Sequence, residues 1–134
     1  MIKSKSWFIP KTKTRPNRAW IHIQPYDYGV LVLWPVTGEQ LKREYLHIAR
    51  DDGSKWPDEA FESTKGKFIS NGETDCIAFF DSRPSPGVIA HEAFHYTKNL
   101  SKQLDLKGEE AKAYLLMYVT DRIYELTRGK DCLI

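Results

Sequence analysis

One short segment contains three side chains whose types and spacing suit hydrolytic chemistry: His91, Glu92 and His95. Residues four apart in a helix lie on one face, so the two imidazoles could bind a single metal ion. Glu92 lies beside them, where a carboxylate can take a proton from a metal-bound water. A zinc ion lowers the pKa of that water towards neutrality. The segment therefore predicts a zinc-dependent hydrolase with Glu92 as general base.

A chance pair of histidines on an amphipathic helix is the alternative interpretation. The neighbouring residues 88–90 and 93–94 carry no charge, which predicts that this helix is buried. Burying two imidazoles and a carboxylate without partners would be costly, whereas a bound metal would satisfy all three. We therefore favour the metal site.

A catalytic zinc needs three protein ligands and one open position. No histidine follows His95, so the third ligand is expected to be an acid unless His22 or His47 serves. The second C-terminal helix is expected to pack antiparallel to the first, with its first turns near His95, which favours Glu109 or Glu110. The full set of acidic candidates is Asp105, Glu109, Glu110, Asp121 and Glu125.

The sequence His-Glu-Ala-Phe-His at 91–95, followed by Glu-Ala-Lys-Ala-Tyr at 110–114, resembles small gluzincin-type zinc metallopeptidases. These include minimal phage-encoded versions and the ImmA/IrrE-type peptidases, and the resemblance spans residues 75–120. In those proteins an acid near the start of a helix is the third zinc ligand. The resemblance therefore implies Glu110 in that role, with Glu109 or Asp105 as alternatives if the loop cannot bring Glu110 round.

The group that would stabilise the oxyanion is expected to be a tyrosine. Tyr114 lies one turn after Glu110 on the same helical face, and its phenol could donate a hydrogen bond to the developing negative charge. Tyr96 and Tyr118 are alternatives. For each of the three, packing in the core is the favoured interpretation, because tyrosines at helical spacing commonly pack there.

Two helices are expected to carry this site. The first should span residues 86–103, with Ser85 as N-cap and Pro86 at its first position, and the second residues 108–128, with Gly129 as its stop. A short buried strand at 75–81 precedes them. In the peptidases that this chain resembles, the strand at the edge of the cleft pairs with an extended peptide substrate, so the resemblance implies that role for residues 75–80.

The N-terminal half is expected to be mainly β. Residues 19–24 and 29–34 predict a hairpin, and 41–49 fit either a strand or a short helix. Residues 51–72 are expected to form a long loop with a short helix at 57–62. The expected fold class is α+β and zincin-like: a small, mostly antiparallel sheet packed on two C-terminal helices that carry the metal site.

The composition is that of one globular domain over residues 1–134, with 41% hydrophobic and 28% charged residues and a net charge of +2. Two cysteines and no long apolar run favour a soluble, cytoplasmic protein with no membrane partner, in the host cytoplasm if phage-encoded. Residues 1–18 hold six lysines and arginines and no acid. They predict a basic arm or edge strand, and a nucleic-acid contact is not favoured because no binding motif accompanies them.

Three functions are consistent with these features. The leading one is a zinc metallopeptidase acting on a protein or peptide. The second is a non-catalytic, zinc-containing binding protein of the phage or host-interaction type, whose basic arm contacts a partner. The third is hydrolysis of a non-peptide amide such as a cell-wall fragment.

Overall fold

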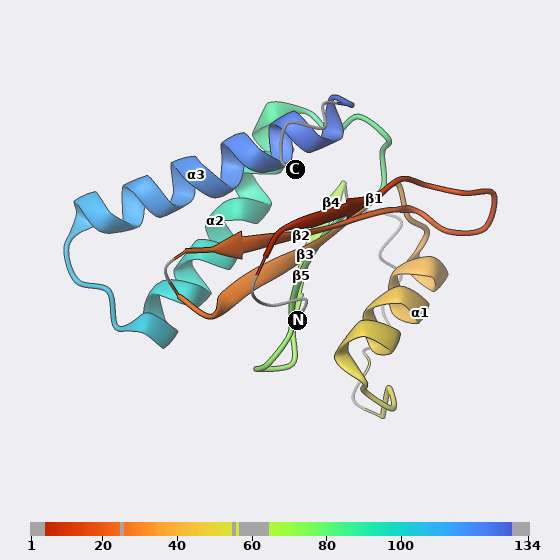
Figure 1. Ribbon diagram of the computed structural model, residues 1–134, viewed down its shortest axis with the longest axis horizontal. Coiled ribbons are helices and arrows are strands. Elements are labelled where there is room, and N and C mark those ends of the chain that lie inside the picture. Colours follow the sequence, from red (N-terminus) through yellow and green to blue (C-terminus); the bar gives the residue numbers. More distant parts are fainter. Residues whose placement is uncertain (1–4, 25, 55, 57–64, 130–134) are drawn as a thin grey trace.

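The computed structural model describes residues 5–24, 26–54, 56 and 65–129. These residues form a five-stranded mixed sheet in the order β1-β2-β3-β5-β4, with helices on both faces (Figure 1). Three of the four strand pairs are antiparallel and β3–β5 is parallel. The fold class is α+β with a mostly antiparallel sheet, as the sequence predicted.

The first three strands form two antiparallel pairs, β1–β2 and β2–β3. β2 (Asn17–Ile23) and β3 (Tyr28–Trp34) form the predicted hairpin. β1 (Trp7–Ile9) pairs with β2 and is one edge of the sheet, so part of the basic N-terminal segment is an edge strand. β2 and β3 are almost entirely buried, because helices cover both faces of the sheet at this point.

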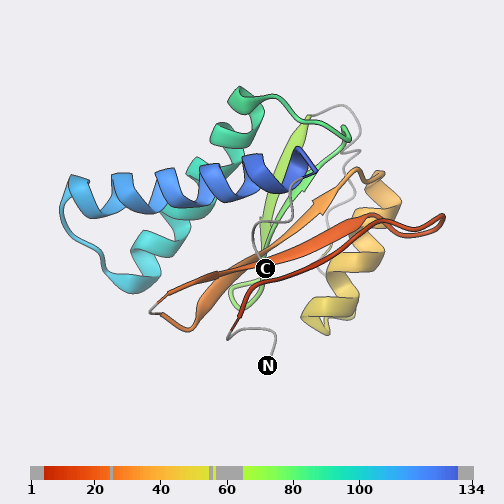
Figure 2. The same ribbon diagram turned by 45° about the horizontal axis from the view of Figure 1, so that its top comes forward.

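Residues 41–49, which the sequence left open between strand and helix, belong to α1 (Gly38–Ala49). A capping box explains the helical outcome, since Thr37 accepts from the Gln40 N–H and the Gln40 side chain accepts from the Thr37 N–H. The apolar face of α1 packs Leu41 and Tyr45 onto the sheet. This face of the sheet is the one opposite the two C-terminal helices (Figure 2).

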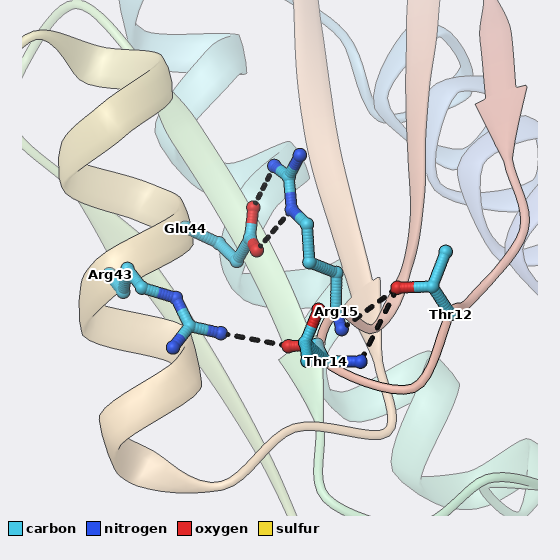
Figure 3. Close-up of polar contacts among 5 residues, drawn as sticks. All are labelled: Thr12, Thr14, Arg15, Arg43 and Glu44. Atoms are coloured by element: carbon cyan, nitrogen blue, oxygen red, sulfur yellow. Dashed lines mark hydrogen bonds and ion pairs between the residues drawn. The ribbon is translucent and has the colours of Figure 1, made fainter.

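An ion pair fastens α1 to the loop between β1 and β2 (Figure 3). The Arg15 guanidinium donates from Nε and Nη2 to the two carboxylate oxygens of Glu44, at 2.8 and 2.6 Å. Arg43 adds a bond from Nη2 to the Thr14 carbonyl at 3.0 Å. Glu44 is 2% exposed, and the hydrogen bonds from Arg15 hold the pKa of its carboxyl below the usual range.

The remaining two strands correct the sequence interpretation. β5 (Asp75–Phe79) is the predicted buried strand, but it lies between β3 and β4, and none of its residues lines the cleft beside His91 and Glu92. The edge position belongs to β4 (Gly66–Ser70), which lies inside the stretch 51–72 that was expected to be a loop. The short helix expected at 57–62 lies outside the described residues. Phe68 and Ile69 are the only strongly β-prone residues of β4. The Gly and Lys residues beside them are depleted in strands and weakened the strand pattern.

The C-terminal helices confirm the expected boundaries closely. α2 (Pro86–Leu104) begins with the Ser85 side chain accepting from the Val88 N–H, and α3 (Glu109–Thr127) ends just before Gly129. Arg128, after α3, donates from Nη2 to the Pro84 carbonyl before α2, at 2.8 Å. The end of α3 therefore lies at the start of α2, and the two helices run antiparallel (Figure 2).

Both helices bury apolar side chains on the same face of the sheet, in a cluster with Phe79 of β5. Among the described residues, no helix is both long enough and apolar enough to cross a bilayer.

Candidate metal centre

α2 brings His91 and His95 together one turn apart. Their Nε2 atoms lie 3.2 Å from each other, and the two rings meet edge to face with centroids 4.8 Å apart. α2 begins at Pro86, with Ser85 as its N-cap, so both histidines lie within regular helix and on the same side of it. Both imidazoles therefore present the same ring nitrogen to one point in space.

The separation of 3.2 Å fits two ligands of one tetrahedral metal ion. Two nitrogens each 2.0–2.1 Å from zinc, at the tetrahedral angle, lie about 3.3 Å apart. The same distance also fits a hydrogen bond in which one neutral imidazole donates to the other. The donor atoms are of a kind that zinc prefers, and their separation is compatible with two ligands of one ion.

The histidines do not lie on a buried face, which corrects the argument made from the sequence. The His91 side chain is 69% exposed and His95 is exposed as well. The buried face of α2 carries Ile89, Ala93 and Tyr96 instead. The uncharged neighbours of the motif thus belong partly to the core and partly to the surface, and burial of the imidazoles gives no support for a metal.

Glu92 is the buried member of the motif, with 6% of its surface exposed. Its Oε2 lies 4.0 Å from Nε2 of His91. Burial raises the pKa of the Glu92 carboxyl, and the nearby charges of His91, His95 and Lys67 offset part of that rise. A carboxylate with a raised pKa is a better proton acceptor near neutral pH.

The histidines and Glu92 line a cleft of about 680 Å³ between α2 and β4. Gly87 and Val88 form the start of its helical wall, and residues 65–68 form its strand wall. The edge strand that sequence reasoning missed is therefore one side of the candidate site. Its role could not be recognised locally, because it depends on which strand ends the sheet.

The structure does not bring Glu110 to the histidines. The described part of the chain contains no group of three His, Cys, Asp or Glu side chains placed to hold a metal ion. α2 continues nine residues beyond His95 to Leu104, which is about 13 Å at 1.5 Å per residue. The first turn of α3, with Glu109 and Glu110, therefore lies beside the end of α2, and the expectation that it lies near His95 is wrong.

The other proposed ligands also lie elsewhere. Asp105 and Glu109 line a separate hollow at the α2–α3 turn. His22 is on β2, and His47 is exposed on α1, which covers the opposite face of the sheet.

The three tyrosines considered for the oxyanion lie outside the cleft lining. Tyr114 is 60% exposed and, with Tyr118, lines a different hollow beside the β2–β3 turn. Tyr96 is fully buried beneath β4, where its ring lies 6.1 Å from that of Phe68. Its hydroxyl has no hydrogen-bond partner among the described residues, and burial raises its pKa.

No protein-family model, curated protein or solved structure matches this chain. The fold and the site alone define its class: an α+β protein with a helix-borne histidine pair and a buried glutamate facing an edge strand.

Proposed function

We propose that this protein is a zinc-dependent peptidase with a zincin-like site. One observation carries the proposal: the Nε2 atoms of His91 and His95 converge to 3.2 Å at the mouth of a cleft whose wall holds the buried Glu92. A chance surface pair of histidines has no need of a buried carboxylate next to it. Burying the Glu92 carboxyl lowers the stability of the fold. A role as general base would explain why a carboxyl group is present there.

The chain's own residues have distinct parts in this proposal. His91 and His95 would hold the zinc ion, which when bound supplies the Lewis acidity that makes water nucleophilic near neutral pH. Glu92 accepts the proton of the attacking water, because its raised pKa suits it to that exchange. The same carboxyl group then returns a proton to the leaving amine as the peptide bond breaks.

β4 is the element that would hold a peptide substrate. It is the last strand in the sheet and pairs only with β5 among the described residues. An extended peptide can add to such an edge through main-chain hydrogen bonds. Its scissile bond would then lie along the cleft beside Glu92, so this role passes from the strand at 75–81 to β4.

The third zinc ligand is the part of the proposal that rests on resemblance alone. Glu110 is the residue that the resemblance implies, although it lies in the first turn of α3, away from the histidines. If Glu110 binds the metal, Glu110→Ala weakens zinc affinity by a factor of ten or more, on the order of the loss of one ligand. An unchanged affinity assigns the third position to another group.

The proposal is tested by zinc analysis and turnover on the same set of variants. We expect close to one zinc per chain, lost in His91→Ala and kept in His47→Ala, a matched exposed histidine on α1. Glu92→Gln should keep the zinc and lose hydrolysis of a peptide library. A Glu92→Gln variant that still cleaves at the wild-type rate would exclude the proposed general base.

A second candidate function is a non-catalytic, zinc-containing binding protein. The lack of a third ligand beside the histidines in the described chain favours it. This candidate predicts zinc binding by the wild type without hydrolysis of any peptide in the library, whereas the peptidase predicts both.

A further inference from the structure

The outer face of α3 carries four large apolar side chains that are exposed. Tyr114 is 60% exposed, Met117 is 53% exposed, and Tyr118 and Tyr124 are 41% exposed each. Phe94 of α2 is 52% exposed and lines a hollow together with residues of α3, so it extends the same apolar surface.

This face of α3 points away from the core. Val119, Ile123 and Leu126 pack in the cluster that α3 shares with α2 and the sheet. Met117 lies two residues before Val119, and two residues of helix turn by about 200°, so these two side chains point in nearly opposite directions. Tyr124 lies seven residues after Met117 and therefore on the same side of the helix. α3 runs along the outside of the molecule, with α2 and the sheet on one side of it (Figure 1).

The exposed apolar area is large for a monomer. Large side chains of this kind have about 150–250 Å² of surface each, so exposed fractions of 41–60% leave about 500 Å² on the five of them. Contiguous apolar patches on monomers rarely exceed about 300–600 Å². Two such faces in contact would bury about 1,000 Å² from these side chains alone, and their polar neighbours would bring the total near the 1,200 Å² of the smallest specific interfaces.

The charges of α3 are arranged so that this face complements a copy of itself. Glu109 and Glu110 lie in the first turn of α3, and Arg128 follows its last residue. Arg128 donates to the Pro84 carbonyl and the Thr127 hydroxyl, but no acidic side chain of the described residues pairs with it. Two copies of α3 packed antiparallel would bring the acidic start of each helix to the basic end of the other, and this also opposes their dipoles favourably.

We propose that the protein forms a symmetric dimer in which α3 packs antiparallel against α3 of a second copy. Tyr114, Met117, Asp121 and Tyr124 follow one another at intervals of three, four and three residues. This is the spacing by which two helices pack along a seam, and a two-fold axis makes each contact twice. Neither the cleft nor its histidines form part of this seam, so the dimer does not depend on the proposed function.

One register of the two helices satisfies both the apolar and the charged positions. Tyr114 then faces Tyr124 of the second copy, and the two aromatic rings can pack against each other. The same register sets Glu110 opposite Arg128 of the second copy. Opposite charges therefore meet at both ends of an apolar seam.

Sedimentation velocity in the presence of EDTA measures the dimer. An interface near the lower size limit predicts a Kd on the order of 10 µM, so the protein is sampled from about 1 to 300 µM. EDTA is needed because zinc shared by the exposed histidine pairs of two copies would also produce a dimer. A dimer that disappears when EDTA is added overturns the proposal.

Two substitutions at Met117 test the register, because this residue faces Asp121 of the second copy. Met117→Glu brings two carboxylates together and should weaken the dimer by about thirtyfold or more. Met117→Lys brings an ammonium group to the same carboxylate and should stay within about threefold of the wild type. Ile9→Glu, which changes an exposed apolar side chain on β1, is the matched control and should leave the Kd unchanged. Circular dichroism and thermal melting identify any variant that has lost its fold.

The remaining outcomes each exclude part of the proposal. A wild type that is still monomeric at about 300 µM overturns the dimer, and its cosedimentation with lipid vesicles would assign this face to a membrane surface. Equal weakening by Met117→Glu and Met117→Lys overturns the antiparallel register. An effect of Ile9→Glu as large as that of Met117→Glu overturns α3 as the interface. Zinc-dependent peptide cleavage by a monomeric wild type would remove the dimer and leave the proposed function standing.

Discussion

Gly66 of β4 lies directly against Glu92 of α2. A Cβ built at position 66 would come within 2.9 Å of Glu92 Cγ and 3.3 Å of its Oε2, and would also meet the Phe79 ring at 3.3 Å. Only a residue without a side chain lets the edge strand approach the candidate general base this closely. The position of the carboxylate therefore depends on a glycine from a distant part of the chain.

Gly66→Ala should displace Glu92 and lower turnover by about one to two orders of magnitude, since small misplacements of a catalytic group are costly. Zinc content should stay unchanged, because the atoms nearest an added Cβ belong to Glu92 and Phe79 and not to the histidines. Gly87→Ala is the matched control: Gly87 lines the same cleft but has no atom within 4 Å of an added Cβ. If both variants keep wild-type turnover, the close approach has no catalytic role.

The raised pKa of Glu92 predicts how stability depends on pH. A carboxyl whose folded pKa lies above its unfolded value binds its proton more tightly when folded, so the protein loses stability as pH rises from the unfolded value to the folded one. In the metal-free protein, Glu92→Gln should therefore increase the free energy of unfolding at pH 7. That gain should vanish below about pH 4, the range of an unfolded glutamate.

Urea titrations of wild type and Glu92→Gln at several pH values measure this difference. Equal stability of the two metal-free proteins at pH 7 would contradict a raised pKa for Glu92.

The ion pair between Arg15 and Glu44 should stabilise the attachment of α1. Glu44→Ala should cost about 1–3 kcal/mol, because it leaves charged guanidinium groups without their buried partner, whereas the exposure of Arg15 reduces the loss. Arg43→Ala, which removes one exposed hydrogen bond to the Thr14 carbonyl, should cost about 0.5 kcal/mol or less.

The contribution of Glu44 to stability should change with pH in the direction opposite to that of Glu92. The pKa of Glu44 is lowered in the folded state, so its contribution is complete above the unfolded pKa and disappears as pH falls through the folded one. The stability difference between wild type and Glu44→Ala, measured by denaturant titration, should therefore narrow in acid. If the stability difference between wild type and Glu44→Ala stays constant down to low pH, packing and not charge attaches α1 to the sheet.

Tyr114→Phe should leave turnover within about twofold of the wild type, a change too small for the loss of an oxyanion donor. Tyr114 lines the hollow beside the β2–β3 turn and not the cleft between α2 and β4. Steady-state kinetics on a cleaved peptide provide the measurement. A loss of a hundredfold or more would mean that α3 approaches the histidines during catalysis.

Local signals were enough to predict α2, the hairpin and the limits of α3. Ser85 and Pro86 start a helix wherever they stand before such a run, and the four-residue spacing of His91 and His95 places them on one face without help from the rest of the chain. The placement of the two imidazoles on one face of α2 was therefore determined by the sequence alone.

The environment of that pair was decided by the tertiary structure. Which side of α2 is buried depends on how the helix lies on the sheet, and this placed Glu92 inside and the histidines outside. The identity of the edge strand depends on the order of strands, and this gave the cleft wall to β4 instead of β5. Glu110 lies away from the pair because nine residues of α2 follow His95 before the chain turns. Each of these outcomes depends on contacts between distant segments, which helical periodicity and capping cannot encode.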